Sequence, residues 1–167
     1  MSQSGLSDPA RERDWDAWYA EHLRVMVTVP GIGSAQRLTT GSPGCSPSLA
    51  MYSVVSADVF ADPYYLRVRG MGEWLPLIDK RHYHRNLFAG LENAPAVPDD
   101  CALVVVDRER PAELPGVTLT WLEAVGLDRS TPYRGIAVVT RAAAEALAGH
   151  DVGVYRPVAA RTLPRRT

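Results

Sequence analysis

The first feature of this chain that can do chemistry is a histidine with aromatic neighbours. His22 lies four residues after Trp18 and three after Tyr19. On a helix, these spacings place the three side chains on one face. An imidazole with an ordinary pKa of about 6.5 can take up or release a proton at neutral pH, as enolisation, aldol cyclisation, dehydration or lactone isomerisation requires. We therefore expect His22 to be a general acid/base, although a lone helical histidine is also typical of a surface or of a hydrogen-bonded core.

Two further histidines have the spacing of a strand. His82 and His84 are two residues apart, so in an extended chain they point to the same side, with Tyr83 and Arg85 on the other. Either both histidines face a pocket or neither does, and we take His84 as a second candidate acid/base. A His-x-His pair can bind a metal, but no third ligand with supporting spacing accompanies it, so we predict no metal site.

Other side chains in the predicted first half could orient a substrate. Arg37 could hold a carboxylate or enolate oxygen through a bidentate contact, although strand alternation allows a solvent-facing arginine equally well. Aromatic side chains could stack on a planar substrate, and core packing is the alternative explanation for them. The candidate substrate-binding residues are Trp18, Tyr19, Tyr52, Tyr65 and Trp74.

The composition and the missing motifs argue against several classes of function. A net charge of −1 argues against nucleic acid as the main partner. No apolar run approaches the roughly 18 residues of a membrane helix, and the first residues form no secretory signal, so we expect a cytoplasmic protein without membrane contact. Nucleotide-binding and hydrolase motifs are absent, so we predict no cofactor. Cys45 and Cys101 lack metal-binding spacing and are expected to be reduced thiols.

The elements that must position these residues follow from periodicity. Apolar residues at three- and four-residue steps predict an amphipathic helix over 14–29. Strands are predicted over 32–40 and 48–56, joined as a hairpin; a helical segment begins at 57, and a strand follows over 82–91. After a proline-containing stretch, the predicted elements are strands over 102–107, 117–125 and 133–140, a helix over 141–149 and a strand over 152–158.

An internal repeat relates the two halves of the chain. Val-Pro-Gly-Ile at 29–32 and Leu-Pro-Gly-Val at 114–117 each precede a predicted hairpin, although Pro-Gly before a strand is also common by chance. We expect the α+β class, with tandem ferredoxin-like halves and antiparallel sheets, the first half lacking its opening strand and the second its first helix. The predicted parts are a flexible N-terminus (1–12), a first half carrying the site (13–92), a linker (93–100), a degenerate second half (101–160) and a tail (161–167).

Short motifs in the first half resemble one known group of proteins. They are WYAEHL at 18–23, VPG at 29–31, AQRL at 35–38, DPYY at 62–65 and HRNLF at 84–88. Together they are similar to the EthD-like members of the dimeric α+β barrel superfamily. This resemblance implies a ferredoxin-like sheet that packs against a second one and encloses a pocket between sheet and helices. Members include cofactor-free monooxygenases, polyketide cyclases, lactone isomerases, dehydratases and haem-handling enzymes, so the fold does not fix the reaction.

Our leading hypothesis is a cofactor-independent cyclase, isomerase or lyase that acts on a polyketide-like or aromatic small molecule, in secondary metabolism or aromatic breakdown. His22 would be the general acid/base, supported by Arg37 and His84. A cofactor-free monooxygenase and a non-catalytic ligand-binding or assembly protein are the alternatives. Because a missing opening strand would leave a sheet edge that something must cover, we also expect a homodimer.

Overall fold

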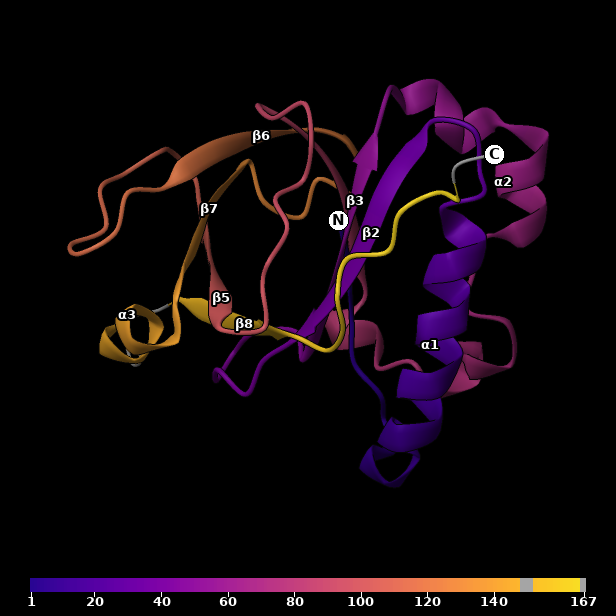
Figure 1. Ribbon diagram of the computed structural model, residues 1–167, viewed down its shortest axis with the longest axis horizontal. Helices are drawn as coiled ribbons and strands as arrows, with labels where there is room; N and C mark the ends of the chain where they lie inside the picture. The colour runs from indigo at the N-terminus through magenta and orange to yellow at the C-terminus, as the bar shows by residue number, and fades with distance from the viewer. Residues whose placement is uncertain (148–151, 166–167) are drawn as a thin grey trace.

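The strands of this protein form one closed antiparallel barrel. The structure, a computed structural model, describes residues 1–147 and 152–165 (Figure 1). Around the barrel, the strand order is β1-β3-β2-β8-β5-β7-β6-β4. The strands are β1 (Ser2–Ser4), β2 (Ile32–Thr39), β3 (Ser48–Val54), β4 (His84–Ala89), β5 (Cys101–Arg108), β6 (Thr120–Leu127), β7 (Tyr133–Thr140) and β8 (Gly153–Pro157). The α-helices are α1 (Glu12–Met26), α2 (Pro63–Val68) and α3 (Arg141–Ala146), and short 3₁₀ turns lie at Pro9–Arg11, Ala57–Ala61, Gly72–Leu77 and Lys80–His82.

Non-local strand pairs close the barrel. In β1, Ser2 pairs with Ala50 of β3 on one side and with Arg85 of β4 on the other. Strands β2 and β8 meet through Leu38 opposite Pro157, and β4 continues the ring to β6. Each described strand therefore has a neighbour on both sides, which leaves no unpaired sheet edge for another chain to extend.

The fold class expected from the sequence was wrong. We expected tandem ferredoxin-like α+β halves of the dimeric barrel type, with the opening strand of the first half missing. The structure instead has a single closed eight-stranded barrel within the described residues, and its helices are few. The opening strand exists as β1, inside the stretch 1–12 that we expected to be flexible. We expected a homodimer because a second copy could cover a free sheet edge. Strand β1 occupies that edge, so this reason no longer applies, and the homodimer stays a prediction.

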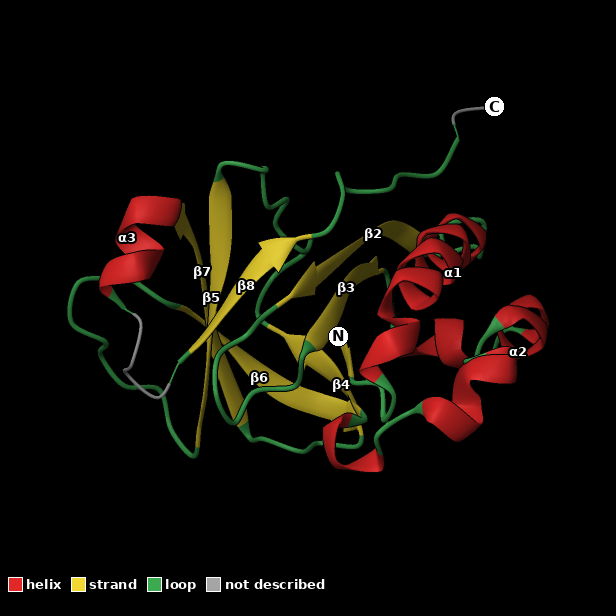
Figure 2. Ribbon diagram, turned by 90° about the horizontal axis from the view of Figure 1, so that it is seen from below, coloured by secondary structure: helices red, strands yellow, loops and turns green. Residues whose placement is uncertain are grey.

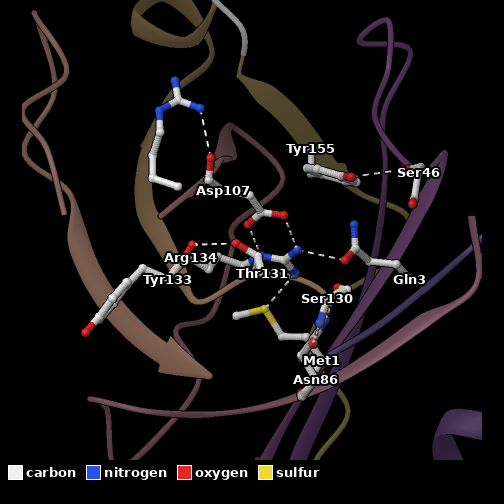
Figure 3. A network of polar contacts seen from close by, with 11 residues as sticks. Met1, Gln3, Ser46, Asn86, Asp107, Ser130, Thr131, Tyr133, Arg134 and Tyr155 are labelled. Atoms are coloured by element: carbon white, nitrogen blue, oxygen red, sulfur yellow. Dashed lines mark hydrogen bonds and ion pairs between the residues drawn. The ribbon is translucent and has the colours of Figure 1, made fainter. Parts of the chain in front are cut away.

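Apolar side chains and one buried arginine fill the barrel interior. The apolar members include Leu38, Leu49, Met51, Leu103 and Ile136. Arg134 of β7 is 0% exposed, and its Nε and Nη2 atoms donate to the two carboxylate oxygens of Asp107, each at 2.7 Å (Figure 3). Nη2 also donates to the Gln3 side chain at 2.7 Å, so β1 is tied to the opposite wall of the barrel. The segment 93–100, expected to be an exposed linker, packs on the barrel through Val97, which is 2% exposed.

Helices cover two separate parts of the barrel's outer surface. Helix α1 presents Trp15, Tyr19, Leu23 and Met26 on one face, at the spacing of an amphipathic helix. This face packs on outward-facing residues of β2 and β3, and α2 lies beside it, whereas α3 lies at the other side of the barrel (Figure 2). The predicted helix 141–149 corresponds to α3, with 148–151 outside the described residues. Over the residues that can be described, no helix has the length and apolar character needed to cross a membrane.

Candidate functional site

A cavity of about 440 Å³ lies between the helical layer and the outer surface of β1, β3 and β4. Helix α1 contributes Tyr19, His22 and Met26 to its wall, and α2 contributes Tyr65 and Leu66. The strands contribute Ser2, Tyr52, Val54, Arg85 and Leu87. The strands also contribute Ile32, Asn86 and Leu127, and the segments between the strands and α-helices contribute Phe60, Arg69, Met71 and Tyr83. The cavity is thus mostly apolar and aromatic, with a few polar groups, as is typical of small-molecule sites.

In the described part of the chain, His22 is the one imidazole in the wall of this cavity. Its ring stacks on Trp18, with ring centroids 4.8 Å apart and an angle of 10° between the planes, and it meets Tyr19 edge-on at 5.8 Å. Among the described residues, the ring nitrogens of His22 have no hydrogen-bond partner. Burial disfavours the charged form and lowers the pKa of His22 to about 4. At neutral pH the imidazole is therefore uncharged, and one nitrogen is available to accept a proton.

Phenol groups gather beside the imidazole. Tyr19, Tyr52, Tyr65 and Tyr83 all line the cavity. Burial raises the pKa of Tyr19, although the nearby Arg37 charge and a hydrogen bond with Tyr52 oppose this. Burial also raises the pKa of Tyr52 well above its ordinary value, and that of Tyr65. Tyr19, Tyr52 and Tyr65 therefore stay protonated at neutral pH, so they can donate hydrogen bonds to a bound oxygen.

The charged residues of the cavity wall have one sign. Of the described residues that line it, Arg69 and Arg85 are cationic, and none is an aspartate or a glutamate. Arg85 lies on β4, and Arg69 ends α2. The Nε atom of Arg85 is buried and has no hydrogen-bond acceptor. The cavity therefore carries positive charge that described protein carboxylates do not neutralise.

Arg37 lies outside this cavity, although we expected it to hold a substrate oxygen. It is 4% exposed, and its Nη1 atom lies 2.5 Å from a carboxylate oxygen of Asp16. Its Nε donates to Ser48 at 2.9 Å, and its guanidinium carbon lies 4.8 Å from the ring centre of Tyr19. Arg37 therefore supports Tyr19 from behind the cavity wall and makes no approach to a molecule inside it.

His82 and His84 also lie outside the cavity. They line a second cavity of about 420 Å³ at one end of the barrel, together with Cys45, Asp107 and Tyr155. The two histidines share a side as expected, and it is Tyr83 and Arg85, on the opposite side of the same segment, that face the first cavity. In this arrangement His84 has no contact with a molecule bound next to His22.

The aromatic candidates divide into wall residues and packing residues. Tyr19, Tyr52 and Tyr65 line the cavity, as expected. Trp18 reaches it only through its ring contacts with the wall residues His22 and Tyr19. Trp74 is 3% exposed and packs on Trp15, with ring centroids 5.1 Å apart. The two tryptophans therefore shape the support of His22 and do not contact the cavity contents.

The sequence did not point to Tyr83, Arg85 and Arg69 as site residues. The alternation of β4 could have found the first two, because they must lie opposite His84. No local pattern distinguished the cavity side of β4, since Leu87 and Phe88 give both of its faces an apolar residue. In the part of the chain that the structure describes, there is no group of three or more side chains that could bind a metal ion together.

Comparison with protein-family models, with curated proteins and with solved structures finds no match for this chain. The resemblance of its short motifs to EthD-like proteins therefore stays a prediction. The argument for function has to come from the cavity itself.

Proposed function

We propose that this protein is a cofactor-independent enzyme that catalyses a proton-transfer reaction on a small molecule in the cavity beside His22. The reaction would be a cyclisation, an isomerisation or an elimination, with His22 as general acid/base. One observation carries this proposal: an uncharged imidazole without a hydrogen bond to the described residues lies in the wall of a cavity, next to protonated phenols. A positioned base beside hydrogen-bond donors is what proton abstraction next to a carbonyl group requires.

The steps follow from the residues of the wall. The free ring nitrogen of His22 takes a proton from the carbon next to a carbonyl group, and the electron pair of that C–H bond moves onto the carbonyl oxygen. The phenol of Tyr52 or Tyr19 donates a hydrogen bond to the enolate oxygen that forms. The imidazolium then returns its proton to another carbon or to a leaving hydroxyl group. A pKa of about 4 makes His22 a weak base in the empty cavity, and a bound anion raises it because opposite charges favour the imidazolium.

Solvent deuterium exchange tests this proposal without knowledge of the natural substrate. The probes are α-aryl ketones and phenylpyruvate, and NMR follows the loss of the proton next to the carbonyl group in D₂O. We expect the protein to accelerate exchange of at least one probe over buffer. His22→Gln should lower the accelerated rate by about 100-fold or more, the usual contribution of a general base.

The control for this experiment is His84→Gln, because His84 lies in the other cavity. This variant should exchange at the rate of the unsubstituted protein. Full activity in His22→Gln would show that another group removes the proton. Acceleration of no probe by the unsubstituted protein would count against catalysis and favour the binding-protein alternative.

The residues of the cavity wall support the two alternative functions less well than the proposed one. A pocket with His22 as its sole titratable group would favour a non-catalytic binding protein, whereas tyrosines and arginines also line this cavity. A cofactor-free monooxygenase would use a tryptophan or an asparagine to aid oxygen activation. Asn86 lines the cavity, but its amide nitrogen and oxygen are both hydrogen-bonded to Ser130. Its amide is therefore committed to the fold.

A further inference from the structure

Arg85 differs from the two arginines that are fully buried among the described residues. Arg37 and Arg134 are each at most 4% exposed, and each is paired with a carboxylate, Asp16 and Asp107 respectively. Arg85 is half-buried in the cavity wall, and within the described residues its guanidinium forms no ion pair. Its buried Nε also lacks an acceptor. Removing part of a cation from water without a counter-charge is costly, so this half-buried position favours an anion from outside the chain.

The nearby carboxylate of Asp128 does not fill this role. It accepts a hydrogen bond from the backbone N–H of Arg85 at 2.7 Å, and the backbone N–H of Asp128 donates to the Arg85 carbonyl at 2.8 Å. These bonds, with the pairing of Arg85 to Ser2 of β1, fix the main chain of Arg85. The fixed main chain thus keeps the Arg85 side chain in the cavity wall. Its polar end contacts Tyr65 and leaves hydrogen-bonding capacity for a ligand.

Arg69 adds a second positive charge to the same part of the cavity. Both guanidinium charges lower the pKa of Tyr65 against the effect of burial, so both lie close to its phenol. Neither arginine contributes to the lowered pKa of His22, which has burial as its cause. The cavity wall therefore combines a cationic part at Arg85, Arg69 and Tyr65 with the uncharged imidazole of His22.

We infer that the cavity binds an aromatic or conjugated carboxylate, with the carboxylate on Arg85 and the planar body against the tyrosines. Guanidinium groups hold carboxylates through paired, charge-assisted hydrogen bonds, and the exposed Arg69 adds attraction at the entrance. A volume of about 440 Å³ accommodates such a molecule. This inference deepens the proposed function. It rests on that function for one point only, namely that the carbon atom that loses its proton lies beside His22.

Binding of two matched probes tests the inference. The probes are 2-naphthoate and the neutral 2-naphthamide, and their dissociation constants are measured by calorimetry on the full chain. We expect 2-naphthoate to bind at least about 10-fold more tightly, the usual size of a charge-assisted hydrogen bond. Arg85→Met should remove this preference and leave 2-naphthamide binding within about 2-fold, which also reports that the cavity remains folded. The control Arg110→Met, at an exposed site away from the cavity, should keep the preference.

Two further variants keep the test decisive. Arg69→Met changes an exposed residue and should reduce the preference for 2-naphthoate by about 3-fold, even if Arg85→Met does not fold. His22→Gln should keep the preference while it loses deuterium exchange, so the two proposals fail separately. Equal affinity for both probes in the unsubstituted protein, or an unchanged preference in both arginine variants, would overturn the inference.

Discussion

Lowering the pH from 7 to 4 should destabilise the fold through His22. The unfolded chain protonates this histidine at about 6.5, whereas burial lowers the pKa in the folded protein to about 4. Between these values the unfolded state binds more protons, so the contribution of His22 to stability is intact above pH 6.5 and is lost as the pH falls. A difference of about 2.5 units corresponds to about 3 kcal/mol of unfolding free energy at most. The partial exposure of His22 reduces this value.

Two measurements check this expectation. NMR titration of the imidazole Hε1 resonances, assigned by the signal that His22→Gln removes, should give His22 a pKa near 4. Urea unfolding at pH 7, 6, 5 and 4 should show that His22→Gln loses less stability between pH 6.5 and 4 than the unsubstituted protein. The difference between the two proteins isolates the contribution of His22, because every other titrating group is common to both.

The reasoning would be refuted by a His22 that titrates at 6.5 or above. Such a value would mean that water or a carboxylate reaches the imidazole, and the ring would then be partly charged at neutral pH. An identical pH dependence of stability in His22→Gln and the unsubstituted protein would contradict it equally.

The remaining predictions concern the packing that holds the cavity in place. Arg134→Leu should lower the unfolding free energy by about 1–2 kcal/mol, measured by urea denaturation, because it removes the hydrogen bonds of a fully buried guanidinium to Gln3 and to the partly exposed Asp107; an unchanged value would contradict the role of these contacts. Gly31→Ala should cost about 1–3 kcal/mol, because Gly31 has φ +87° and an added Cβ would lie 2.6 Å from Val59. Gly41→Ala is its control: no atom lies within 4 Å of an added Cβ, so equal losses in both variants would contradict this explanation.

The periodicity of apolar residues along the chain was sufficient to predict most of the helices and strands. The helix predicted over 14–29 is α1, and the strands predicted over 32–40, 48–56 and 133–140 are β2, β3 and β7, with ends that differ by at most three residues. These segments bury apolar residues at regular steps, and such steps can be read along the chain. Strand β1 has three residues without an apolar side chain and is held by backbone pairing to two distant strands, so it left no pattern to read.

Closure of the barrel depends on pairs that local sequence does not specify. The contact between β2 and β8 joins residues more than 100 positions apart, as Leu38 and Pro157 show. The candidate site, like the fold, was predictable only where it depends on local sequence. Helical spacing identified His22 and Tyr19, but the choice between His84 and Arg85 depended on which side of β4 the helices cover. That choice is a property of tertiary packing.

The most direct test of the whole account is a crystal structure of the protein with bound 2-naphthoate. We predict that the ligand fills the cavity between α1 and β4, with its carboxylate on Arg85 and its ring system between Tyr52 and His22. A ligand bound in the other cavity, beside His84 and Cys45, with the first cavity empty, would contradict the assignment of both the site and the residues that act in it.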